Sequence, residues 1–323
     1  MAGKALSETV KVNKSGRKTV SALIMDRLKL IGQGKYLYAM LLLPAVYFIV
    51  FKYGSMFGLL IAFENYNFVK GVFGSEWVGL LHFRDFMSDP YFWKLVRNTV
   101  LLNVWMMVFY FPAPILLALL LNEARIGLFK KFAQTVSYLP HFLSTVVVCG
   151  MVINFLSNEG MINRLLGLVG LEPYSFLMDA NWFRSIYIGS EIWQGIGWGS
   201  IIYLAALTAV DPQLYEAATM DGASRIQQIR HITLPGIASV ITVMFLLNLG
   251  NVMSIGYEKI LLLYTGPTYE TADVISTYVY RRGLLGNDFS YATAVELFQS
   301  VIALCFVVLA NRFARKVSET SLW

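Results

Sequence analysis

The chain has 323 residues, of which 57% are hydrophobic and only 14% are charged. Soluble globular domains carry about 25% charged residues, so this composition excludes an ordinary soluble enzyme and also a disordered or fibrous protein. It predicts a membrane protein, in which the location of the net charge of +6 matters more than its size. No nucleic-acid partner is therefore expected. The two cysteines lie in apolar runs, which indicates no disulfide framework.

Six apolar stretches are long enough to cross a bilayer. Each has about 20 residues or more, and backbone groups in lipid must pair within the segment, so each is expected to be a helix. The predicted fold class is an all-α membrane protein with six transmembrane helices. The expected spans are 37–62, 96–121, 136–156, 186–209, 236–261 and 292–311.

Basic residues predict the orientation. The segments 1–35, 122–135, 210–235 and 312–323 hold eight, three, two and three of the 26 lysines and arginines, and all four fall on one side. Because basic loops stay inside, both termini are expected in the cytoplasm. The domains expected are a basic cytoplasmic segment 1–35, a membrane domain 36–311 and a cytoplasmic tail 312–323.

The basic N-terminal segment does not have the pattern of a cleavable signal peptide, because charged residues interrupt its apolar patch. Two interpretations remain open for it. One is an amphipathic helix on the anionic inner surface of the membrane, and the other is a flexible basic anchor.

The cytoplasmic segment 211–235 predicts two short helices joined by a turn. Asp211 followed by a proline is a helix-start signal, and Ser224 can cap a second helix. Gly222 permits a sharp turn between them, and Pro235 is expected to end the second helix where the next span begins. We name this segment, residues 211–235, the elbow.

Small residues and one carboxylate lie near the corner of the elbow. Ala217 and Ala218 allow the close approach of another backbone, and Glu216 can form an orienting ion pair. The elbow is therefore expected to dock into a pocket on a cytoplasmic partner. The alternative is a surface loop that packs against lipid headgroups.

At this point the sequence resembles a known family. The order Glu-Ala-Ala, Gly, Ile-x-Leu-Pro between two spans is similar to the EAA signature of permease subunits of binding-protein-dependent, type I ABC importers. The resemblance implies that Glu216 bonds a basic residue of an ATPase subunit and that Gly222 shapes the corner. The implied ATPase-coupling set is Glu216, Ala217, Ala218, Asp221, Gly222, Ile232, Leu234 and Pro235.

Four further stretches are similar to the carbohydrate-uptake group of these permeases, in the branch of oligosaccharide, alginate and LplB-type permeases: Phe51–Phe63, Asn98-Thr99, Tyr138–His141 and Ala272–Tyr280. The resemblance implies the type I ABC importer permease fold and a multi-pass location in the bacterial inner membrane. It implies a second homologous permease subunit, two ATPase subunits, an extracytoplasmic solute-binding protein and an oligosaccharide substrate, with alginate fragments as an acidic candidate.

The sequence has no Gly-x-x-x-x-Gly-Lys-Ser/Thr loop for ATP, and no zinc or nucleophile motif. The three histidines, His82, His141 and His231, are far apart and are read as surface residues. The chain is therefore expected to be neither an enzyme nor a holder of metal or cofactor. ATP and Mg are expected on the partner ATPase.

Polar residues inside spans are candidates for a substrate path, because burial in hydrocarbon is costly unless they pair or meet water. In the fourth span, and again in the fifth, the polar and aromatic residues fall on one helix face and form a stripe. The residues of the two stripes are Tyr187, Glu191, Gln194, Trp198, Asn248, Asn251 and Glu258. Aromatic rings suit sugar C–H faces, and amides and carboxylates suit hydroxyls. The alternatives are interfacial aromatics and helix-joining amides, with Gly195, Gly197 and Gly199 permitting close packing.

Four basic residues near span ends could attract acidic sugars, and they are Lys52, Lys259, Arg281 and Arg282. Structural pairing or snorkelling is the competing interpretation for each. Three other functions stay open. They are an ABC permease for a non-sugar solute, an ion-coupled secondary transporter that uses Glu191 or Glu258, and an integral-membrane enzyme. The elbow favours the ABC permease, because a secondary transporter gives no reason for it. The membrane enzyme is disfavoured by the absence of a recognisable metal or nucleophile constellation.

Overall fold

The computed structural model describes residues 34–124, 127–250 and 256–317. The two interpretations of the basic N-terminal segment, and the predicted path residue Asn251, therefore lie outside the described residues. Contacts divide the chain into two compact units, residues 1–60 and 61–323.

The described part of the first unit is one continuous helical rod. Helix α2 (Lys35–Phe48) runs through a π-helical turn (Ile49–Tyr53) into α3 (Gly54–Met56), and a 3-10 turn follows. Its residues are apolar almost throughout, as expected of a segment surrounded by hydrocarbon. The candidate span that contains it, Tyr36–Phe63, agrees with the predicted 37–62 to within one residue at each end.

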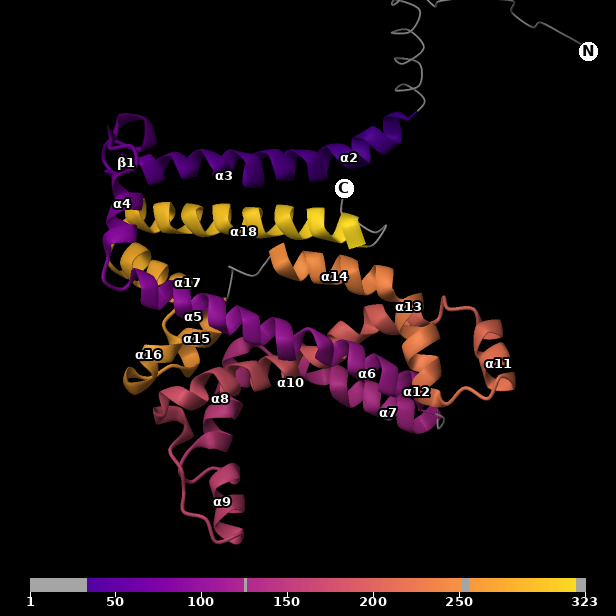
Figure 1. The fold of residues 1–323 in the computed structure, drawn as a ribbon. Coiled ribbons are helices and arrows are strands. Elements are labelled where there is room, and N and C mark those ends of the chain that lie inside the picture. Colours follow the sequence, from indigo (N-terminus) through magenta and orange to yellow (C-terminus); the bar gives the residue numbers. More distant parts are fainter. Residues whose placement is uncertain (1–33, 125–126, 251–255, 318–323) are drawn as a thin grey trace, which may run out of the picture. The chain divides into compact units, whose positions relative to one another are not determined.

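The second unit is mainly helical, with one two-stranded antiparallel hairpin in which Glu64 pairs with Trp77 (Figure 1). Its strands and α-helices are β1 (Glu64–Asn65), β2 (Glu76–Trp77), α4 (Leu81–Ser88), α5 (Phe92–Trp105), α6 (Pro112–Glu123), α7 (Gly127–Tyr138), α8 (Thr145–Leu156), α9 (Met161–Leu168), α10 (Ala180–Leu207), α11 (Pro212–Met220), α12 (Arg225–Gln228), α13 (Leu234–Gly236), α14 (Ala238–Gly250), α15 (Tyr257–Leu263), α16 (Tyr269–Ala272), α17 (Ile275–Val279) and α18 (Phe289–Val317).

Among the described residues, four helical segments are long and apolar enough to cross a membrane: Tyr36–Phe63, Phe92–Glu123, Thr145–Leu168 and Phe289–Arg312. Two bent helix pairs raise the number to as many as six if each pair is one span. The first joins α10 to α11 with a bend of 76°, and the second joins Arg225–Gly236 to α14 with a bend of 63°. The prediction of an all-helical membrane fold is confirmed, and the six predicted spans agree with the upper count.

Two predicted spans are wrong as single helices. In the third, 136–156, the α-helix stops at Tyr138, because Pro140 lacks an amide donor and the Ser144 side chain caps a new helix by accepting from Val147 N. In the fifth, 236–261, α14 ends at Gly250 and α15 begins only after Gly256, whose ψ of 118° is not helical. Glycine favours such breaks because it has a low helix propensity.

Three other spans are longer than predicted, because the helices continue through polar residues beyond the ends of the apolar stretch. They are Phe92–Glu123 against 96–121, α10 against 186–209 at its start, and α18 against 292–311.

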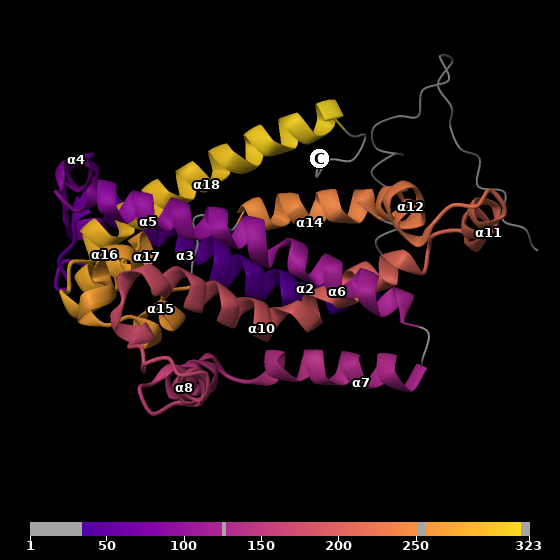
Figure 2. The same cartoon turned by 60° about the horizontal axis from the view of Figure 1, so that its bottom comes forward.

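Helix α10 lies at the centre of the second unit, where it packs against α6 and α7, and α14 lies beside α18 (Figures 1 and 2). Three glycines of α10 allow the close approach. A Cβ at Gly195 would overlap the Tyr110 hydroxyl, one at Gly197 the backbone of Ser137, and one at Gly199 the ring of Pro114. The close-packing interpretation of these glycines is confirmed.

The second unit has two ends that are formed by different groups of short helices. Helices α11 and α12 lie at one end, and α15, α16 and α17 lie at the other, as both views show (Figure 2). The single long helix α10 runs between them and so links the elbow to the region around α15.

Candidate functional site

The first arm of the elbow is the short helix α11, and both of its ends have specific caps. The Asp211 carboxylate accepts from the Gln213 amide at 2.9 Å, and Pro212 occupies the first turn. The predicted helix start at Asp211 is therefore confirmed.

The corner of the elbow is a Schellman motif. Gly222 has φ +78°, and its amide donates to the Thr219 carbonyl at 3.1 Å, while the Ala223 amide donates to the Ala218 carbonyl at 2.9 Å. Glycine adopts this left-handed conformation without the steric cost that a Cβ brings. The predicted turn at Gly222 is confirmed.

The second arm begins with a capping box. The Ser224 amide donates to Gln227 Oε1 at 2.7 Å, and the Gln227 amide donates to Ser224 Oγ at 3.4 Å, as the predicted cap at Ser224 requires. The prediction that Pro235 ends this helix is wrong by one residue, because the helix runs on to Gly236. A π-helical turn, Ile229–Thr233, precedes Pro235. It changes the backbone hydrogen-bond pattern just before the proline, which has no amide N–H to donate.

The two arms are held together by part-buried polar contacts. The Gln228 side chain donates to Thr219 Oγ1 at 3.1 Å and to the Ala223 carbonyl at 3.3 Å. The hydroxyls of Tyr215 and Thr233 are 3.0 Å apart. These bonds give the elbow one defined shape.

The coupling residues implied by the resemblance share the surface of this corner. Glu216, Ala217, Asp221 and Gly222 are exposed, and Ala218 is half-buried. No ion pair or hydrogen bond of the Glu216 side chain occurs within the described part of the chain, so its carboxylate is free to meet a cation of another molecule. The last three members, Ile232, Leu234 and Pro235, lie on the second arm.

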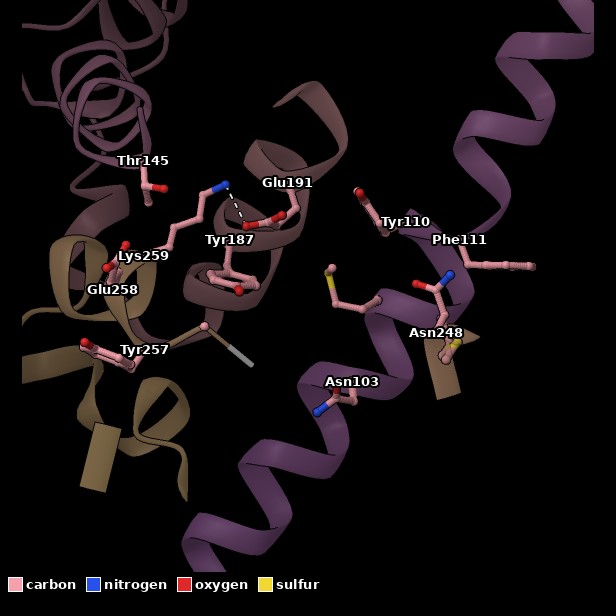
Figure 3. Close-up of a pocket in the computed structure, with 13 residues that line it drawn as sticks. Asn103, Tyr110, Phe111, Thr145, Tyr187, Glu191, Asn248, Tyr257, Glu258 and Lys259 are labelled. Carbon is pink, nitrogen blue, oxygen red and sulfur yellow. Dashed lines mark ion pairs between the residues drawn. The ribbon is translucent and has the colours of Figure 1, made fainter. Parts of the chain in front are cut away.

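A cavity of about 400 Å³ lies among α5, the π-helical turn after it, α8, α10, α14 and α15 (Figure 3). Four of the predicted path residues line it together: Tyr187, Glu191, Asn248 and Glu258. Its size is within the range of small-ligand sites, which is about 300–1,000 Å³.

Of the other predicted path residues that the structure describes, neither Gln194 nor Trp198 lines this cavity. Gln194 donates to the Leu143 carbonyl at 3.2 Å, and the ring of Trp198 stacks on that of His141 with centroids 4.5 Å apart. The expectation of one stripe on the fifth span is also wrong, because Glu258 belongs to α15 and Asn248 to α14.

An ion pair forms part of the cavity wall. Lys259 is only 4% exposed, and its Nζ lies 2.8 Å from Glu191 Oε1 and 3.2 Å from Gln194 Oε1 (Figure 3). Lys259 is therefore paired within the protein, as the structural-pairing interpretation expects. Arg281 is paired as well, because it makes a bidentate pair with Asp273. Because Glu191 is already neutralised by Lys259, it is a poor candidate for the cation site of a secondary transporter.

The sequence reasoning missed four polar lining residues, Asn103, Tyr110, Thr145 and Tyr257. Asn103 and Tyr110 are seven residues apart in the second predicted span, a spacing that puts them on one helix face. The signal that could have found them is the rule already applied to the fourth span, that polar groups within a hydrocarbon segment are candidates for function.

Comparison with protein-family models gives a match over residues 54–319 to the binding-protein-dependent transport system inner membrane component. Two relatives from Bacillus subtilis (strain 168) cover nearly the whole chain. The chain is 49% identical over 297 residues to the polygalacturonan/rhamnogalacturonan transport system permease protein YteP, with 92% of each chain covered. It is 43% identical over 290 residues to the protein LplB, with 90% of this chain and 91% of that one covered.

The fold is similar to that of a chain in the crystal structure of a bacterial ABC transporter involved in the import of the acidic polysaccharide alginate. The TM-score is 0.84 at 43% sequence identity, and the match covers 91% of this chain and 99% of that chain. The same values apply to a crystal structure of bacterial alginate ABC transporter in complex with alginate pentasaccharide-bound periplasmic protein.

Proposed function

The chain belongs to the family of binding-protein-dependent transport system inner membrane components, and from this membership we propose that it is the permease subunit of an ATP-driven importer of oligosaccharides. The observation that carries the proposal is the cavity of Figure 3, where aromatic rings and hydrogen-bonding side chains face one space. Rings such as Tyr187 and Tyr257 suit sugar C–H faces, and groups such as Asn103 and Asn248 suit hydroxyls.

The substrate class we propose is the acidic oligosaccharide, from pectic or alginate-like polysaccharides. Two similar proteins support this choice, since one bears the name of a polygalacturonan/rhamnogalacturonan permease and the other belongs to an importer of alginate. An extracytoplasmic solute-binding protein delivers the sugar in this proposal, and the alginate importer bound to its periplasmic protein supports that partner.

We propose that the elbow couples the chain to an ATPase. Its fixed shape and the free Glu216 carboxylate suit a rigid body that docks into a cleft with a basic residue. The complete importer would contain a second homologous permease and two ATPase subunits, with ATP and Mg held by the ATPases and no cofactor on this chain.

The elbow also supports an orientation of the chain in the membrane. In this proposal the end of the second unit that carries α11 and α12 faces the cytoplasm, and so do segments 1–35 and 312–323, with residues 36–311 forming the membrane domain. The basic residues of these segments support the assignment, because such residues are retained on the cytoplasmic side.

The proposal is tested by rebuilding the importer in proteoliposomes from this chain and its neighbouring permease, ATPase and solute-binding protein. Uptake of radiolabelled oligogalacturonides and alginate oligosaccharides should require both ATP and the binding protein. A neutral galactooligosaccharide is the matched control for charge. Uptake without an ATPase, or uptake of no oligosaccharide by the intact complex, would overturn the proposal.

A further inference from the structure

Lys259 and its partner Glu191 both line the cavity, but the lysine is the more deeply buried of the two. The lysine is 4% exposed, and the side chain of Glu191 is 25% exposed. A solute in the cavity can therefore reach the carboxylate side of the pair while the ammonium stays fixed. An ammonium has three donors, and Glu191 and Gln194 take two of them within the part of the chain that the structure describes.

Stability alone does not explain this pair. Removing an ion from water costs several kcal/mol, and buried ion pairs do not, as a rule, stabilise a fold more than apolar residues of the same volume. Ionisable residues within a membrane domain mark substrate or ion pathways by default. The cation of this pair is the positive charge in a wall that also carries two carboxylates, Glu191 and Glu258.

We infer that Lys259 is a specificity-determining residue for acidic sugars, and that Glu191 occupies the place of the substrate carboxylate while the cavity is empty. The inference rests on the proposed function. A uronate carboxylate entering the cavity replaces Glu191 on the Lys259 ammonium, so the buried cation keeps a partner throughout. A neutral sugar offers no anion for this exchange and leaves the original pair in place.

The surrounding groups suit exchange rather than permanent capture. Gln194 holds the ammonium from the side, and the Tyr187 ring lies 5.9 Å from Nζ, so the position of the cation does not depend on Glu191 alone. The displaced Glu191 and the neighbouring Glu258 both repel a bound carboxylate. A site on a transport path must release what it binds, and this repulsion limits how long the sugar stays.

The test compares oligogalacturonides with their methyl esters, which keep the same rings without the charge, in the reconstituted complete importer. The inference predicts that Lys259→Gln raises the KM for the acid about tenfold and leaves that for the ester unchanged, since one charged contact is worth about 1.4 kcal/mol. Glu191→Gln removes the internal competitor and should lower the KM for the acid several-fold. Lys131→Gln, at an exposed lysine of α7 outside the cavity, is the control for loss of a lysine.

A charge-swap variant controls for loss of folding or assembly. The Glu191→Lys, Lys259→Glu double variant keeps an ion pair, so it should insert and assemble, yet it presents the charges reversed and should not restore the preference for acid. A Lys259→Gln importer that handles acid and ester in the wild-type ratio would overturn the inference while the proposed function stands. A wild-type complex that imports neither sugar would overturn the proposed function itself, and the inference with it.

Discussion

Gly197 and Ser137 lie in direct backbone contact between α10 and α7. A Cβ built at residue 197 would overlap the carbonyl oxygen of Ser137, and backbone atoms cannot rotate aside as a flexible side chain can. Small residues allow helices in membranes to pack this closely, where dispersion forces replace the hydrophobic effect as the source of attraction. This contact therefore fixes α7 against the helix that runs from the cavity to the elbow.

The contact predicts that Gly197→Ala destabilises the purified chain in detergent by about 2–3 kcal/mol, through forced separation of the two helices. Thermal unfolding followed by circular dichroism measures the effect. Gly189→Ala on the same helix is the matched control, because no heavy atom lies within 4 Å of its ideal Cβ, and it should be neutral or slightly stabilising. Equal effects of the two substitutions would show that the helix contact is not the cause.

The elbow could be predicted from the sequence because its signals are local. The side chains of Asp211 and Ser224 cap amides two and three positions away, and Gly222 adopts the turn conformation through its own backbone, so the caps and the turn form without help from the rest of the fold. The one error, at Pro235, came from a π-helical turn, which depends on packing and has no sequence signal as clear as a cap.

The cavity could be predicted only in part, because it depends on contacts between distant segments. Tyr187 and Glu191 share a helix face, and their spacing was enough to group them. Lys259 looked like a span-end residue, since its apolar surroundings hide the break that brings α15 back against α10. Hydropathy reports how apolar a stretch is and says nothing about where a helix stops within it.

Gly222→Ala tests the corner of the elbow. An alanine with φ near +78° carries a steric cost of about 1–2 kcal/mol, so we expect a loss of about 1 kcal/mol in stability and weaker retention of the ATPase. Gly222→Asp should be worse for uptake, because it adds a charge at the docking surface. Gly167→Ala in α9, a helical glycine with open space around it, is the control. Normal ATP-coupled uptake by Gly222→Asp would contradict the proposed coupling role.

The buried carboxylate of Asp273 should be a strong stabiliser because it satisfies several donors. It accepts two bonds from Arg281, at 2.9 and 2.7 Å, and one from the Thr277 hydroxyl at 2.7 Å. Asp273→Asn leaves a partly buried guanidinium without its counter-ion, and we expect a loss of about 2–3 kcal/mol in the free energy of unfolding. Asp85→Asn, at an exposed position, should change stability by less than about 0.5 kcal/mol. A small effect at Asp273 in thermal unfolding would refute the argument.

The pH dependence of stability has a defined contribution from Glu270. Hydrogen bonds from Lys94 and Arg97 hold the pKa of its carboxyl below the ordinary value. A group whose pKa falls on folding stabilises the fold above its unfolded pKa, which is about 4.3 for glutamate, and loses that effect as the pH drops through the folded pKa. The difference in Tm between the wild-type chain and Glu270→Gln should therefore be present at pH 7 and vanish in acid. A difference that grows in acid would show the opposite sign.

Glu216→Ala separates coupling from folding, because the side chain is exposed and makes no hydrogen bond or ion pair within the described part of the chain. Its removal should leave the stability and the topology of the chain unchanged. Loss of a buried charge pair at an interface weakens binding by 2 kcal/mol or more, so retention of the ATPase on the tagged complex should fall about tenfold or further. Gln213→Ala, exposed on the same helix, should retain the ATPase normally. Full retention by Glu216→Ala, with normal ATP-coupled uptake, would rule out the carboxylate as the docking contact.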